Sequence, residues 1–146
     1  MATSTLKWST LPALTSYLTG ELDALANNGL VIGAAIAAGN EMWMNVQLSI
    51  ATQASARSAG ANVAIYMVRS LDGGSTYDYG SASLVPGAHT LRIALPLDAA
   101  VTARVVNGLI FIPACTHCKL VPENKTGVVF AAGNTLSYSF VSEIAE

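Results

Sequence analysis

Short runs of alternating apolar and polar residues, from Trp43 onward, constrain the fold of this chain most strongly. In the first run Met44, Val46, Leu48 and Ile50 alternate with polar residues, which is typical of an antiparallel strand with one buried face. Similar runs follow at residues 61–70, 89–95, 101–112, 118–123, 128–131 and 135–141. Gly, Pro, Asn and Asp residues separate these runs and favour turns. About seven short strands predict an all-β, antiparallel sandwich or barrel over residues 41–146.

Residues 1–40 have a different pattern and are expected to form an N-terminal arm with a short, partly helical segment. Apolar side chains recur there at spacings of three and four, at Trp8, Leu11, Leu14, Leu18, Leu22 and Leu25. This spacing predicts one stripe of a helix that begins near Pro12 and ends at residues 27–29. Gly20 lowers the helix propensity, so one or two short helical pieces are favoured. The whole chain of 146 residues is expected to be one structural unit, because two separate cores of half that size would be marginal.

Charged residues are scarce in this chain. Seven Lys and Arg and nine Asp and Glu make up 11% of the sequence, against about 25% in ordinary soluble domains. The hydrophobic content of 52% excludes a disordered chain, and a net charge of -2 excludes binding to nucleic acid driven by electrostatics. No apolar run approaches the roughly 18 to 20 residues needed to cross a bilayer, so no membrane contact is expected. The apolar excess favours a homo-oligomer that buries it.

One cluster resembles a redox or metal motif, at Cys115, His117 and Cys118. We interpret the two cysteines as reduced thiols that pack as small apolar groups and are dispensable for function; a redox or metal role is the alternative. The sequence has no nucleophile elbow, phosphate-binding loop or His-Glu-x-x-His motif. We therefore expect a protein that is not an enzyme and has no catalytic residue, metal or cofactor.

The segment 71–80 is a candidate recognition loop. Asp72, Tyr77 and Tyr79 combine an acid with flat amphipathic rings, as sugar-binding loops and antibody-like paratopes do. The simpler interpretation is a tight turn at Asp72-Gly73-Gly74, with the tyrosines capping one end of the sandwich.

The order of features resembles the capsid decoration, or cement, proteins of tailed bacteriophages. The resemblance is carried by an opening Leu-x-Trp, by residues 14–27 (LTSYLTGELDALAN), by residues 71–77 (LDGGSTY), by residues 119–127 (KLVPENKTG) and by residues 133–138 (GNTLSY). It implies a β-sandwich or jelly-roll core that assembles as a trimer on the outside of the head. The cysteine cluster at 115–118 and the ending at residues 142–146 depart from this pattern and leave open a role in the tail or a fibre.

The expected function is that of a virion structural protein. A homotrimer would bridge neighbouring major capsid subunits at the capsid surface, after synthesis in the host cytoplasm, with no direct contact to nucleic acid. Leu6, Trp8, Leu11 and Tyr17 are the expected capsid or subunit contacts, the first three in a docking arm outside the sandwich. A helix that merely covers one end of the sheet is the alternative for that arm. The alternative function is a carbohydrate-binding or adhesion module of a phage tail or fibre, carried by the Tyr77 and Tyr79 loop.

Overall fold

A computed structural model describes residues 6–8, 12–78, 86–141 and 143–145 of the chain. Its elements in chain order are β1 (Leu6–Trp8), β2 (Thr15–Leu18), β3 (Ile36–Ala37), β4 (Trp43–Ile50), β5 (Asn62–Ser70), the short 3-10 helix η1 (Ala88–Thr90), β6 (Leu91–Pro96), β7 (Arg104–Phe111), β8 (His117–Lys125), β9 (Thr135–Val141) and β10 (Glu143–Ala145). Apart from η1, the regular elements of the described part of the chain are therefore all strands, as the alternating runs predicted.

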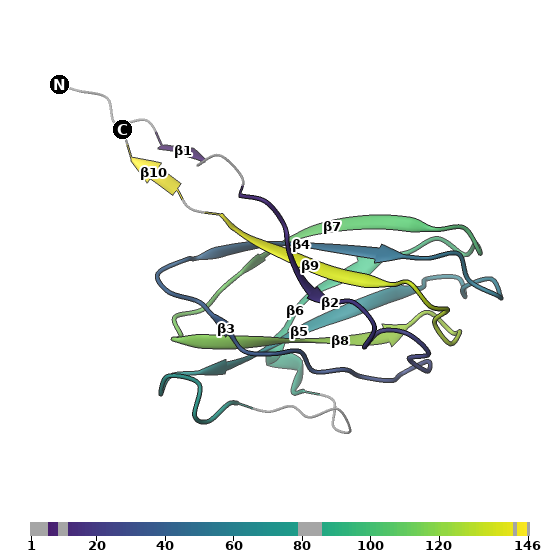
Figure 1. Cartoon of the computed structure of the whole chain (residues 1–146), viewed down its shortest axis with the longest axis horizontal. Helices are drawn as coiled ribbons and strands as arrows, with labels where there is room; N and C mark the ends of the chain where they lie inside the picture. Colours follow the sequence, from purple (N-terminus) through teal and green to yellow (C-terminus); the bar gives the residue numbers. More distant parts are fainter. Residues whose placement is uncertain (1–5, 9–11, 79–85, 142, 146) are drawn as a thin grey trace.

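The strands form two four-stranded antiparallel sheets that face each other as layers (Figure 1). One sheet has the order β2-β9-β4-β7 and the other β3-β8-β5-β6. The chain changes sheet at every connection between β2 and β9 except the one from β5 to β6, and this is the strand order of an eight-stranded jelly roll. The expected antiparallel sandwich is confirmed, and its connectivity is that of the jelly roll.

The strand pairs are nested like the two arms of one long hairpin. β5 pairs with β6, β4 with β7, β3 with β8, β2 with β9, and β1 with β10. The outermost pair, β1 and β10, forms a separate two-stranded ribbon that extends beyond one end of the sandwich (Figure 1). Both ends of the chain therefore leave the sandwich on the same side.

The core lies between the sheets and is built from the alternation of the strands. In β4, Met44, Val46 and Leu48 are fully buried while the residues between them are half-buried, as the sequence pattern predicted. β5 departs from simple alternation, because residues 63–68 are buried on both faces of their sheet. Its inward side chains join the main core, and its outward ones form a second, smaller cluster.

The helix expected between Pro12 and residue 29 is wrong. Residues 15–18 form β2, which pairs with β9, and a series of turns follows at residues 19–28. Leu18 at the end of β2 and Leu22 in the turn that follows both point into the core, and this produces the spacing of four. Leu14, which would share the same helical stripe, is instead 44% exposed. The same expectation for residues 9–11 lies outside the described residues.

Two further expectations about organisation differ from the structure. The run at residues 128–131 is not a strand, because the chain there turns back toward residues 24 and 25, to which Phe130 is hydrogen-bonded. The expected division at residue 40 does not separate arm from sandwich, since β2 and β3 lie before it and pair within the two sheets. The other runs form strands whose bounds agree with the expected ones to within about three residues.

Candidate interaction surface

The outward side of the sheet β2-β9-β4-β7 carries three large exposed apolar side chains, all on β7. The strand register places the outward residues of β4 beside those of β7: Trp43 beside Phe111, Asn45 beside Leu109, Gln47 beside Asn107, and Ser49 beside Val105. On the other side of β4, the outward row of β9 includes Ser137 and Thr135. We call these named outward residues of β4, β7 and β9 the open face; Ser139 and Val141 lie in the same row of β9 but are buried.

The open face is free of charge. Arg104 is the one charged residue in the four strands of this sheet as the structure describes them, and it stands at the first position of β7. Its guanidinium group is engaged in an ion pair, in which Nε donates a hydrogen bond to Asp98 Oδ2 at 2.8 Å. The remaining side chains of the face are aliphatic, aromatic, amide or hydroxyl groups, so burying it would not desolvate an ion.

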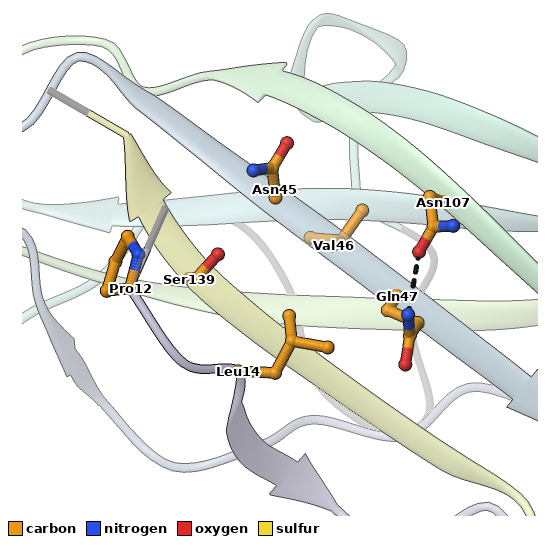
Figure 2. Close-up of a pocket in the computed structure, with 7 residues that line it drawn as sticks. All are labelled: Pro12, Leu14, Asn45, Val46, Gln47, Asn107 and Ser139. Atoms are coloured by element: carbon orange, nitrogen blue, oxygen red, sulfur yellow. Dashed lines mark hydrogen bonds between the residues drawn. The ribbon is translucent and has the colours of Figure 1, made fainter. Parts of the chain in front are cut away.

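A shallow hollow of about 300 Å³ lies on this face across β9, β4 and β7 (Figure 2). The amides of Asn45, Gln47 and Asn107 line it together with Ser139, and Pro12 and Leu14 form an apolar border. Gln47 Nε2 donates to Asn107 Oδ1 at 2.9 Å, whereas the Asn45 amide has no hydrogen bond to another described residue. The hollow therefore offers hydrogen-bond donors and acceptors beside an apolar border, and none of its lining residues carries a charge.

One end and one edge of the open face are apolar. The rings of Trp43 and Phe111 meet edge to face with their centroids 5.4 Å apart. Phe111 and Leu109 are each 45% exposed, and Val105 is 58% exposed. These three side chains lie in the outward row of β7, an edge strand of its sheet, with Asn107 between Val105 and Leu109. Together they form an aliphatic and aromatic strip that stays about half exposed among the described residues.

The outward side of the other sheet is covered by the chain itself. Ala64, Tyr66, Val68 and Val121 form a buried cluster there, and Leu30, Ile32 and Tyr77 pack on it. Glu123 is also buried on this side, where its carboxylate accepts a hydrogen bond from Tyr66 at 2.8 Å and pairs with Lys125 at 3.1 Å. Burial and this hydrogen bond raise the pKa of Tyr66 to about 12. The polar groups of Tyr66 and Glu123 are therefore engaged in contacts within the chain.

Tyr17, one of the expected contact residues, has its hydroxyl group inside the sandwich. The hydroxyl donates to the Ala34 carbonyl oxygen at 2.8 Å and accepts from the Leu120 N–H at 3.0 Å. Burial raises its pKa well above the usual range. Gly33 makes this position possible, because a Cβ there would overlap the Tyr17 ring. Tyr17 therefore joins β2 to the edge of β8 and offers no free polar group to a partner.

The other expected contacts lie at the N-terminal end. Leu6 and Trp8 are the first and last residues of β1, paired with Ala145 and Glu143 of β10. Leu11 lies outside the described residues. The structure thus places the first two in the terminal ribbon, away from the open face, and the docking role of this segment stays a prediction (Figure 1).

The candidate recognition loop is organised around Asp72. Its carboxylate accepts hydrogen bonds from the Ser70 hydroxyl at 2.6 Å, the Ser75 N–H at 3.1 Å, and both the N–H and the hydroxyl of Thr76 at 2.9 and 2.6 Å. These bonds hold the pKa of Asp72 well below its usual range. The Tyr77 ring lies under Lys119 Nζ, 4.1 Å from its centroid, and its hydroxyl is buried. Tyr79 lies outside the described residues. The described geometry is that of a tight turn.

Both cysteines are free thiols in the structure. Cys118, on β8, packs in the main core, and burial raises its pKa to about 12. Cys115 precedes β8 and is half-buried against the same core. No group of three His, Cys, Asp or Glu side chains that could hold a metal ion occurs among the described residues. No helix in the same part of the chain is long and apolar enough to cross a membrane.

The residues of the open face were missed as a site by sequence reasoning. The run at residues 101–112 predicted a strand, but Val105, Leu109 and Phe111 alternate with Val106 and Ile110, so both of its faces are apolar. Such a run is typical of a strand buried on both sides. Because β7 is an edge strand, the second apolar row stays about half exposed, and this mismatch between pattern and position is the signal that could have identified it.

Comparison with known proteins adds little to this picture. No protein-family profile matches the sequence, and no curated protein is similar to it. Among solved structures, a chain in the structure of infectious bursal disease virus Gt strain is similar over 98% of this chain and 41% of its own length, with 12% identity and a TM-score of 0.22. This chain therefore spans less than half the length of that one, and a likeness at this level carries no argument about function.

Proposed function

We propose that this chain is a non-enzymatic structural protein of a tailed-phage virion that decorates and cements the capsid. The observation that supports this function most is the open face, an uncharged sheet surface with a strip of exposed aliphatic and aromatic side chains. A surface of this composition can be buried against another protein without the cost of desolvating ions. In this proposal it binds the major capsid protein at the outer surface of the particle, with no turnover and no cofactor.

The family resemblance supports a homotrimer that bridges neighbouring capsid subunits. The low content of charged residues, 11%, agrees with a protein that buries much of its surface in an assembly. Sedimentation velocity of the purified chain at micromolar concentration measures the number of copies directly. A stable monomer over the whole range would contradict self-association.

Capsid binding is tested by co-sedimentation of the purified chain with phage heads that lack it. The Ser137→Lys variant introduces a charge in the middle of the open face, on the central strand β9, and we expect it to weaken binding by at least about tenfold. Val129→Lys is the matched control, because Val129 is exposed and lies outside the sheets. Equal binding of Ser137→Lys and the unmodified chain would reject the open face as the capsid contact.

The second candidate function is a carbohydrate-binding or adhesion module of a phage tail or fibre. The hollow in Figure 2 favours it, because amide side chains beside an apolar border can hydrogen-bond to sugar hydroxyl groups. The Asp72 and Tyr77 loop does not add to this support, since its polar groups are engaged or buried. A glycan screen that finds a ligand whose binding requires Asn45 and Asn107 would favour this function over the first.

A further inference from the structure

The two sheets have four edges, and three of them carry features that hinder pairing with another strand. β2 has four residues and an irregular register opposite β9. β3 has only two residues, and the chain before it follows β8 irregularly, through bonds such as Val31 N–H to the Pro122 carbonyl. β6 contains Arg92, shifts register opposite β5 and ends at Pro96. Short strands, bulges, charges and prolines are the devices by which proteins protect sheet edges.

β7 has none of these devices along its length. It has eight residues, all in continuous register with β4, and no proline. Its one charge, Arg104, is at its first residue and is paired with Asp98. Apart from its ladder with β4, no backbone hydrogen bond of β7 is found in the described part of the chain. Among the described residues, the outer edge of β7 therefore presents N–H and C=O groups without partners, beside the exposed side chains of Val105, Leu109 and Phe111.

We propose that β7 pairs antiparallel with β7 of a second copy of this chain, about a two-fold axis, and that the chain therefore forms a dimer in place of the homotrimer that the family resemblance supports. An antiparallel edge is complementary to itself, because each strand offers the same alternation of donors and acceptors to the other. The outward side chains near the axis are uncharged, so self-pairing brings no like charges together. The product is one continuous eight-stranded sheet with the order β2-β9-β4-β7-β7-β4-β9-β2, and the open faces of the two copies become one surface.

Lysine substitutions on the exposed row of β7 test this pairing. Val105→Lys and Leu109→Lys place like charges on both copies beside the axis, and each is expected to weaken dimerisation by at least about tenfold. Val129→Lys is the matched control, because Val105 and Val129 are both 58% exposed and only Val105 is on the edge. Sedimentation velocity should show a dimer for the unmodified chain and the control, and a monomer for the double lysine variant at about 10 µM.

Hydrogen exchange supplies a second readout that is specific for edge pairing. Dimerisation should protect the amides of β7 that face away from β4, and this protection should disappear on dilution and in the double lysine variant. A monomer at every concentration would overturn the proposal. So would an oligomer that persists in the double lysine variant or that leaves the outer amides of β7 unprotected, a trimer included. The inference does not require capsid binding, which is measured separately by co-sedimentation.

Discussion

The central strands β8 and β9 occupy equivalent positions in the two sheets, yet their outward side chains have opposite surroundings. Val121 on β8 is fully buried, in the cluster on which Leu30, Ile32 and Tyr77 pack. Ser137 on β9 is half-buried and has no such cover. Leu30 and Ile32 of the segment 19–35 and Tyr77 of the segment 71–78 thus cover one sheet. Among the described residues, no comparable buried cluster lies on the outward side of the other sheet.

The largest effect should come from the same substitution on the two central strands. Val121→Lys would bury a charge without a partner and is expected to lower the free energy of unfolding by about 4 kcal/mol. Ser137→Lys should change it by less than about 0.5 kcal/mol, because the lysine can extend into solvent. Chemical denaturation measures both. If Val121→Lys does not fold, Val121→Ala should still lose about 2 kcal/mol. Equal losses at the two positions would contradict the difference between the faces.

Gly33→Ala tests the packing of the Tyr17 ring against the chain at the edge of β8. A Cβ at this position overlaps the Tyr17 ring, so the ring must move, and we expect a loss of about 2 to 3 kcal/mol. Gly20→Ala is the control, because a Cβ there meets no atom within 4 Å; it should change stability by less than about 0.5 kcal/mol. Thermal and urea unfolding distinguish the two variants, and similar values for both would show that Tyr17 adapts freely.

Tyr17→Phe isolates the two hydrogen bonds of the hydroxyl group. It keeps the ring and removes the partners of the Leu120 N–H and the Ala34 carbonyl, with an expected loss of about 1 to 2 kcal/mol. Tyr138→Phe is the matched control. The Tyr138 ring contacts Tyr17 at a centroid distance of 5.9 Å, but its hydroxyl makes no hydrogen bond with a described residue. The control should be nearly neutral, and a loss equal to that of Tyr17→Phe would assign the effect to ring packing instead.

Acidification should destabilise the turn around Asp72, on the side of the covered sheet, and this is the smallest of the expected effects. Its pKa is held down by hydrogen bonds from the Ser70 and Thr76 side chains. In the unfolded chain the Asp72 carboxyl has a pKa of about 3.9, so at about pH 4 the unfolded state binds more protons than the native state. The stabilising contribution of the Asp72 carboxylate is therefore fully present above a pH of about 4 and is lost as the pH falls toward the native pKa. The hydrogen-exchange protection factors of residues 71–78, which correct for the slower intrinsic exchange in acid, should therefore fall on acidification. The Asp72→Asn variant should exchange faster already at neutral pH and show a weaker acid dependence.

The strands of the sandwich could be predicted because their signal is local. Polar and apolar residues alternate strictly over residues 44–50 and 135–140, which form nearly all of β4 and β9. The pairing of β2 with β9 joins residues more than a hundred positions apart and has no local signature. That is why Leu18 and Leu22 were assigned to a helix: their spacing fits a helical turn equally well.

The open face could not be predicted, since a strand pattern does not reveal which side receives a cover. The residues that cover Val121 come from loops, at Leu30, Ile32 and Tyr77, and their destination is decided by tertiary contacts. Likewise, the sequence of residues 71–78 suggested a recognition surface, whereas Asp72 is the centre of its own hydrogen-bonded turn. Composition indicated that an apolar surface must exist, but only the strand order places it on β7 and β4.

The nested pairing of strands sets the order in which this chain can fold as it is synthesised. β5 and β6 can meet early, but β4 must wait for β7, β3 for β8, and β2 for β9. Residues 12–18 therefore leave the ribosome long before their partner strand exists. Since closing such long loops is entropically slow, folding is expected to finish only after β9 has been synthesised, with the N-terminal strand docking last. Until then β9 and β8 each lack a neighbour, and the nascent protein depends on rapid closure to avoid wrong pairings.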